Sequence, residues 1–108
     1  MGQHPIVHIE IGVNNPEQDG KFYGDLFGWE IQTMPMPEMG MDYTMFSTGD
    51  GPGGGLPKID GEMARANEPL VYVGTHDVTE TLDKAAALGG TVVLPKMEIP
   101  GVGWMGIF

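Results

Sequence analysis

The sequence predicts an α+β fold in which one βαβββ unit occurs twice. Aligning the chain with itself so that Gly12 meets Gly74 gives both halves the same order of strand, capped helix, glycine stop and strand. Both leading segments show strand-like alternation, and helical spacing follows in each. In addition, 18 glycines and 9 prolines among 108 residues favour short strands joined by turns over a helical bundle.

The first strand is expected at residues 6–13. Its odd positions are apolar and share one face, because side chains alternate along a strand. His8 and Glu10 share the other face, where their side chains would lie about 7 Å apart. This strand therefore carries one apolar face and one face with titratable groups.

A helix is expected from Pro16 to about Phe27. Asn15 is the expected N-cap, Pro16 suits the first helical position, and Gly28 is the expected stop. The apolar residues of this segment recur at helical spacing and form the stripe that we expect to be buried. They are Phe22, Tyr23, Leu26 and Phe27.

Three short strands should complete the first module, at residues 29–33, at 43–48 and near Leu56. Residues 34–40 are expected to form a loop, because Pro35 and Pro37 disfavour regular structure. The glycine-rich segment 49–55 is expected to be a turn, and it lacks the Gly-Lys-Ser/Thr of a phosphate loop. Within a single domain of residues 1–108, module one covers about 5–60 and a linker about 60–69.

The second module is expected over about 70–108. Its strands are expected at residues 70–75, 91–94 and 103–108, with a turn at 99–101. Asp77 or Thr79 should cap its helix, and Gly89 with Gly90 should end it. Under the internal alignment Tyr72 meets Glu10, so we expect both side chains on the same concave face.

Charge and composition exclude several classes of protein. The net charge of −10 leaves no basic cluster for nucleic acid or anionic lipid, so neither partner is expected. No apolar run is long enough to span a membrane, and no signal-peptide pattern is present. The chain has no cysteine, which removes thiolate chemistry and is compatible with a reducing compartment, so a cytoplasmic location is expected.

Two stretches resemble the vicinal-oxygen-chelate superfamily, which includes glyoxalase I, bleomycin-resistance proteins and extradiol dioxygenases. The first is His8-Ile-Glu-Ile-Gly-Val13 followed by Phe22-Tyr-Gly-Asp-Leu-Phe-Gly-Trp-Glu30. The second comprises the helix end Ala87-Leu-Gly-Gly90 and the segment Ile99-Pro-Gly-Val-Gly-Trp104. The resemblance implies an eight-stranded, curved, cup-shaped mixed sheet with helices outside and a small-molecule site inside. The family pattern continues past Phe108, so the final strand is expected to be missing from this chain.

Metal-using members of this family take four ligands from strands one, four, five and eight. His8 matches the first position, whereas the fourth-strand position falls in Gly53–Pro57 and the fifth on Leu70. The resemblance is therefore to a metal-poor, glyoxalase-like branch. No metal site and no cofactor are expected; a divalent metal would need ligands outside this pattern.

Glu10 and His8 are the candidate catalytic residues, because a carboxylate beside an imidazole can transfer protons. The candidate ligand-binding residues combine these two with aromatic side chains suited to stacking and hydrogen bonding. They are His8, Glu10, Tyr43, Tyr72 and Trp104. The alternative for each is ordinary packing or hydrogen bonding within the fold.

Five of the nine methionines fall between Met34 and Met45. Thioethers repack around varied apolar partners, so this segment is either a ligand lid or a surface loop with buried methionines.

Three functions remain open. The first is a small-molecule-binding, glyoxalase-like lyase or isomerase related to lactoylglutathione lyase. The second is a non-catalytic drug- or metabolite-sequestering protein, as in bleomycin resistance, and the third is a metal-dependent lyase or dioxygenase. A homodimer is expected, with Trp29, the strands of module one or the edge from Trp104 to Phe108 covered by the partner.

Overall fold

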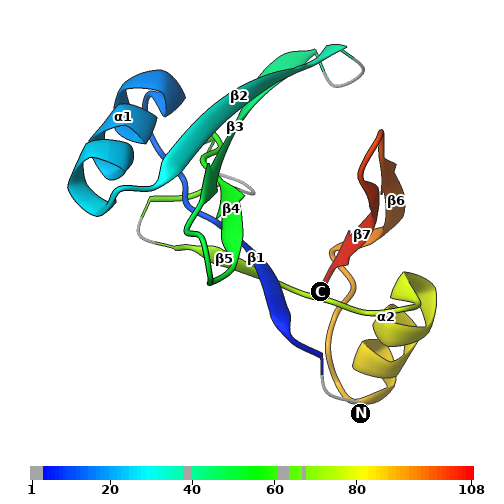
Figure 1. Cartoon of the computed structure of the whole chain (residues 1–108). Coiled ribbons are helices and arrows are strands. Elements are labelled where there is room, and N and C mark those ends of the chain that lie inside the picture. The colour runs from blue at the N-terminus through cyan, green and yellow to red at the C-terminus, as the bar shows by residue number, and fades with distance from the viewer. Residues whose placement is uncertain (1–3, 38–39, 61–63, 67) are drawn as a thin grey trace. The chain divides into compact units, whose positions relative to one another are not determined.

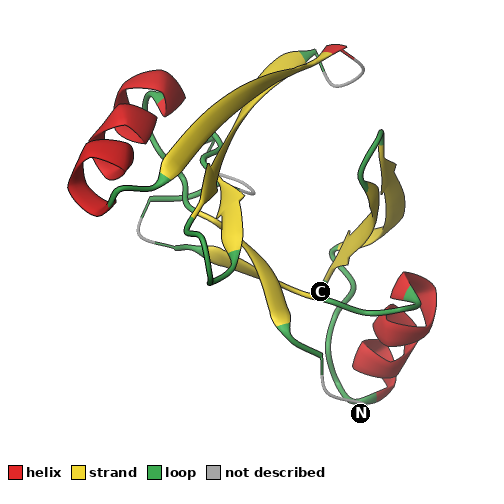
Figure 2. Ribbon diagram, viewed as in Figure 1, coloured by secondary structure: helices red, strands yellow, loops and turns green. Residues whose placement is uncertain are grey.

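The computed structural model describes residues 4–37, 40–60, 64–66 and 68–108. The chain forms two compact units, Met1–Gly74 and Thr75–Phe108. The first unit contains β1 (Ile6–Glu10), α1 (Pro16–Phe27), β2 (Glu30–Met36), β3 (Met41–Ser47), β4 (Gly53–Gly55) and β5 (Leu70–Val73). The second contains α2 (Val78–Ala87), β6 (Leu94–Ile99) and β7 (Gly103–Ile107). Figures 1 and 2 show these elements by position and by type.

The sheet of the first unit has five strands in the order β2-β3-β4-β1-β5. β1 runs parallel to β4, and the other neighbouring pairs are antiparallel. The sheet is curved and does not close on itself (Figure 1). Because β1 is interior, its residues have a partner strand on both sides, which fixes the register of His8 and Glu10.

One face of this sheet packs against α1. Val13, Phe46 and Leu56 form the buried cluster, and Leu56 is only 1% exposed. Partly buried apolar residues surround them: Ile9, Ile11, Tyr23, Trp29 and Ile31. Of the helix stripe that was expected to be buried, only Tyr23 is among them; Phe22, Leu26 and Phe27 are more than half exposed. Ile9, Ile11 and Val13 of the predicted apolar face thus lie in the core, whereas Val7 is 51% exposed. His8 and Glu10 point away from this core.

The two helices begin where the sequence predicts. The Asn15 side chain accepts a hydrogen bond from the Gln18 amide at 3.1 Å, and the Asp77 side chain accepts one from the Glu80 amide at 2.9 Å. These caps satisfy amides that have no intrahelical partner. Gly28 ends α1 with φ of 75°, a conformation that costs glycine little.

Several strand boundaries differ from prediction. The first strand ends at Glu10 instead of residue 13, β3 begins at Met41 instead of residue 43, and β5 ends at Val73 instead of residue 75. β2 continues through Pro35 to Met36, and Pro35 pairs with Asp42. An edge strand tolerates proline because the missing N–H faces no partner. The expected turn at 49–55 contains β4, and β6 begins at Leu94 instead of residue 91.

In the second unit, α2 packs against the β6–β7 hairpin. Leu82 is buried, and its side chain lies over Gly106, where an added Cβ would come within 2.6 Å of it. Gly106 therefore allows the helix to approach β7 closely. Among the described strands, β6 and β7 pair only with each other.

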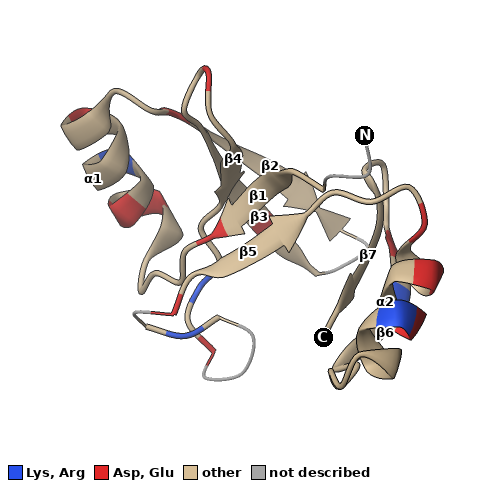
Figure 3. Ribbon diagram, turned by 90° about the horizontal axis from the view of Figure 1, so that it is seen from below, with Lys and Arg blue, Asp and Glu red and all other residues tan. Residues whose placement is uncertain are grey.

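Acidic and basic positions are shown in Figure 3. Acidic positions occur on both helices and in loops of each unit, consistent with the net charge of −10. No described helix is long and apolar enough to cross a membrane.

Candidate functional site

Four of the five predicted site residues meet on the sheet face opposite α1. Tyr43 Oη donates a hydrogen bond to Glu10 Oε2 at 2.6 Å. His8 Nε2 lies 3.3 Å from the same carboxylate oxygen and 3.0 Å from Tyr43 Oη. The rings of His8 and Tyr72 meet edge to face, with centroids 5.3 Å apart. We call these four residues the Glu10 cluster.

The strand register explains why these residues meet. His8 is opposite Tyr72 on β5, and both His8 and Glu10 come from β1. Tyr43 lies two strands away, on β3, so its side chain must cross β4 to reach Glu10. The shortest hydrogen bond in the cluster, from Tyr43 to Glu10, therefore joins β3 and β1, which are not neighbours in the sheet.

Gly55 makes this crossing possible. It is paired with Glu10 on one side and Met45 on the other. A Cβ at this position would overlap the Tyr43 hydroxyl and ring. Glycine is therefore required for Tyr43 to lie over β4.

The hydrogen-bond geometry fixes where the protons lie. An ionised carboxylate only accepts, so the Tyr43 proton points to Glu10. The oxygen of Tyr43 then accepts from His8, and His8 Nε2 must carry a proton. The hydrogen bonds therefore run in one direction, from His8 through Tyr43 to Glu10.

Burial and hydrogen bonding act in opposite directions on Glu10, whose side chain is 22% exposed. Burial raises the pKa of its carboxyl, but hydrogen bonds from His8 and Tyr43 outweigh burial, so the pKa lies below its ordinary value of 4.5. Glu10 is consequently an anion at neutral pH.

The two tyrosines stay protonated. Burial, then the hydrogen bond to Glu10, raises the pKa of Tyr43 well above its ordinary value. Burial and the negative charge of Glu10 raise the pKa of Tyr72 to about 12. Both hydroxyls are therefore hydrogen-bond donors at neutral pH, on either side of a carboxylate that can accept a proton.

Trp104, the fifth predicted residue, lies on β7 in the second unit. The Lys96 ammonium sits 4.8 Å from the centroid of its ring, a cation–π contact. A role for Trp104 in ligand binding stays a prediction.

The cluster does not make a complete metal site. His8 and Glu10 offer two ligands, and β4, the next strand, places only glycines beside them. Within the described ranges no group of three or more His, Cys, Asp or Glu residues could hold a metal ion. The donor set of the Glu10 cluster is therefore too small for a tightly held divalent ion.

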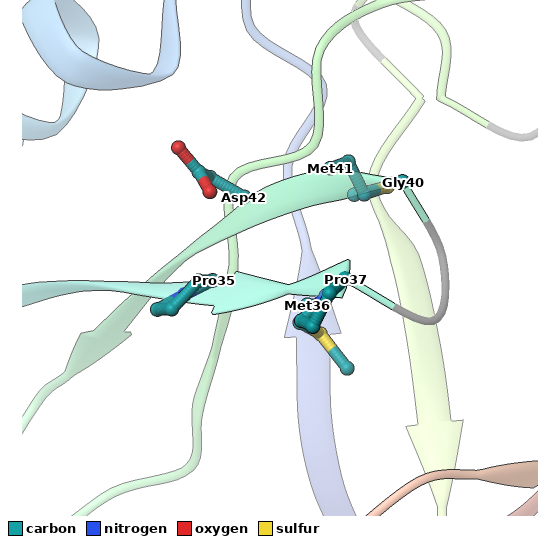
Figure 4. Close-up of a pocket in the computed structure, with 6 residues that line it drawn as sticks. All are labelled: Pro35, Met36, Pro37, Gly40, Met41 and Asp42. Carbon is teal, nitrogen blue, oxygen red and sulfur yellow. The ribbon is translucent and has the colours of Figure 1, made fainter.

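A separate hollow of about 440 Å³ lies at the tip of the β2–β3 hairpin (Figure 4). None of its lining residues belongs to the Glu10 cluster. They are Pro35, Met36, Pro37, Gly40, Met41 and Asp42. Of the five clustered methionines, Met34, Met36, Met41 and Met45 lie on β2 and β3, not in a loop. Met39 lies outside the described residues.

Alternation along the first strand predicts that His8 and Glu10 share a face, and in the structure they do. The sequence does not predict that Gly55 lets Tyr43 reach across β4. The sequence signal is the run of three glycines at 53–55, in the same module as the strand that carries His8 and Glu10.

A comparison with models of protein families identifies one family. The model of the Glyoxalase/Bleomycin resistance protein/Dioxygenase superfamily matches residues 5–104. Proteins named "Putative glyoxylase CFP32" from Mycobacterium bovis and Mycobacterium tuberculosis are each 29% identical over 110 residues, covering 90% of this chain. The chain spans 38% of the length of these relatives.

A solved structure gives the same fold. A variant of Streptomyces coelicolor methylmalonyl-CoA epimerase, in complex with 2-nitronate-propionyl-CoA, superposes with a TM-score of 0.58 and 23% identity. The match covers 91% of this chain and 81% of the epimerase chain. This likeness confirms the predicted α+β fold with a curved mixed sheet.

Proposed function

The chain belongs to the Glyoxalase/Bleomycin resistance protein/Dioxygenase superfamily, and we propose that it binds a small organic molecule at the Glu10 cluster and acts on it as a lyase or isomerase. The observation that carries this proposal is the ionised Glu10 carboxylate beside two neutral tyrosine hydroxyls. A base and hydrogen-bond donors on one sheet face suit proton transfer next to a carbonyl. Relatives named as a glyoxylase and an epimerase are in line with such chemistry.

Each residue has a role in this proposal. Glu10 takes a proton from the carbon next to the carbonyl of the ligand. Tyr72 donates a hydrogen bond to the oxygen on which negative charge then develops, while Tyr43 holds the carboxylate in place. A bound ligand excludes water from the cluster, and lower solvation raises the basicity of the carboxylate toward that of a useful base.

The experiment is a turnover screen with hemithioacetals of methylglyoxal and other vicinal dicarbonyls. Solvent-deuterium exchange into each compound, followed by NMR, detects proton abstraction even without net reaction. Glu10→Gln should abolish exchange, since the amide cannot accept the proton. Glu17→Gln, on the exposed first turn of α1, is the matched control and should keep wild-type exchange. Exchange that survives Glu10→Gln would remove Glu10 as the base.

A sequestering function is the second candidate, and one observation favours it. The pKa of Glu10 is held low by its hydrogen bonds, which makes the carboxylate a stable anion and a weak base. With a net charge of −10, such a site suits a cationic ligand. Calorimetric binding of a cationic drug of the bleomycin class, lost in Glu10→Gln and without any turnover, would support this function over catalysis.

We further propose that the protein forms a homodimer in the cytoplasm. The support is the β6–β7 hairpin, whose strands pair with no other described strand and so leave open edges. Trp104 and Phe108 are also exposed, at 56% and 68%. Light scattering across micromolar concentrations tests this proposal; a constant mass of 11.6 kDa would overturn it.

A further inference from the structure

The sheet face that carries the Glu10 cluster continues into a row of methionines. Residues directly opposite in an antiparallel pair point to the same face. Met34 is opposite Tyr43, Met36 is opposite Met41, and Gln32 is opposite Met45. Because Tyr43 reaches Glu10 on this face, all four methionines lie on the same face as the cluster.

The methionines are arranged in order along the strands. Met45 and Glu10 share a row, since both pair with Gly55. The next row along β3 holds Tyr43 and Met34, and the third holds Met41 and Met36. Four residues of β3 separate the first row from the third, which is roughly 14 Å of strand. We call this series the methionine track.

The track is not part of the described core. The buried cluster of the first unit lies on the opposite face, around Leu56. Met34 and Met41 are 40% and 43% exposed within the structure. The far end of the track reaches the hollow at the hairpin tip, which Met36 and Met41 help to line.

We infer that the ligand of the Glu10 cluster is an amphiphile, with a non-anionic, hydrogen-bond-donating head at Glu10 and an unbranched apolar chain along the methionine track toward the hairpin-tip hollow. This inference rests on the proposed binding function and adds the class of ligand. The Glu10 anion excludes a carboxylate head and accepts hydrogen bonds from a hydroxyl or ammonium group. Flexible thioethers fit an unbranched chain better than a rigid ring, because they adjust to its conformation.

The test uses three series of probes, primary alkylamines from ethylamine to octylamine, the matching alcohols, and the matching carboxylic acids. Titration calorimetry measures the dissociation constant of each probe below its micelle concentration. Each added methylene should tighten amine or alcohol binding about twofold to fourfold until the track is filled. The acids should bind at least about tenfold more weakly than amines of equal length, because their charge faces Glu10.

Variants separate the head from the chain. Met34→Gln with Met41→Gln should flatten the dependence on chain length while ethylamine binds as before. Leu88→Gln replaces an exposed leucine at the end of α2 and is the matched control, with an unchanged series. Glu10→Gln should remove the preference for amines over acids. Circular dichroism and thermal unfolding verify that each variant is folded.

The outcomes distinguish this inference from the proposed function. If ethylamine binds through Glu10 but longer chains add nothing, the track is refuted and the cluster stands as a binding site. If affinity grows with chain length but does not change in Glu10→Gln, the head is not at Glu10 and the inference fails. Absence of binding by all three series would also overturn it, whereas deuterium exchange into vicinal dicarbonyls would independently preserve the proposed reaction.

Discussion

Gly55→Ala should break the contact between Tyr43 and Glu10 without changing either residue. The new methyl group would occupy the space of the Tyr43 hydroxyl, so the ring must rotate away. The loss is one hydrogen bond to a charged group, about 1.5–3 kcal/mol. Replacing glycine by alanine returns about 0.4–1 kcal/mol, since Gly55 is not among the glycines with positive φ. The free energy of unfolding should therefore fall by about 0.5–2.6 kcal/mol.

Two measurements test this reasoning. Urea unfolding gives the free energy, and carboxyl ¹³C NMR titration gives the pKa of Glu10, which should rise because one of its hydrogen bonds is lost. In a Tyr43→Ala background the methyl group has room, so Gly55→Ala should be neutral or stabilising by up to about 1 kcal/mol.

A control substitution separates the effect of space from that of glycine itself. Gly74→Ala places its methyl 3.2 Å from a Val7 methyl group, with no ring to displace. It should change stability by less than about 1 kcal/mol. If Gly55→Ala changed stability equally with and without Tyr43, the role assigned to Gly55 would be refuted.

Three further predictions concern acid, alkali and metal. The pKa of Glu10 in the folded protein lies below 4.5, so its contribution to stability is present above pH 4.5 and is lost as pH falls through the folded value. In urea unfolding, the free energies of wild type and Glu10→Gln should therefore converge in acid. The pKa of Tyr72 is raised from 10.0 to about 12, so its contribution to stability is present below pH 10 and is lost as pH rises toward 12. The free energy of unfolding of Tyr72→Phe should therefore fall less steeply with pH in alkali than that of wild type, and an equal slope would contradict the assignment. Purified protein should carry Zn, Ni, Fe or Mn well below stoichiometry after dialysis, because incomplete ligand sets bind weakly; a full equivalent that disappears in His8→Ala would show a metal site.

The sequence predicted the features that depend on nearby residues, such as the helix caps. Asn15 and Asp77 cap their helices through their own side chains, so residue type and position were sufficient. The internal alignment also agrees with the structure, because it aligns Asn15 with Asp77 and each of these residues caps its own helix. Alternation alone put His8 and Glu10 on one face, because one face of β1 is covered by the core.

Features that depend on distant strands could not be predicted. Pro35 remains in β2 only because β2 is at the sheet edge. The β-branched segment at 91–93 lies before β6, whose pairing with β7 begins where Leu94 is opposite Ile107. The contact between Tyr43 and Glu10 requires β4 to pair with β1 in parallel and β3 in antiparallel fashion, and no local pattern encodes that choice.

The direction of the hydrogen bonds in the cluster has a consequence for proton movement. In the ionised state each donor points along the path from His8 through Tyr43 to Glu10. A proton arriving on Glu10 Oε2 turns that oxygen into a donor, and the whole path can then reverse. Tyr43 would then donate to Nε2, which releases its own proton to solvent while Nδ1 takes one up from solvent. The cluster can therefore report a proton gained on β1 as a change of histidine tautomer, with every heavy atom in place, and ¹⁵N chemical shifts of His8 would read that change directly.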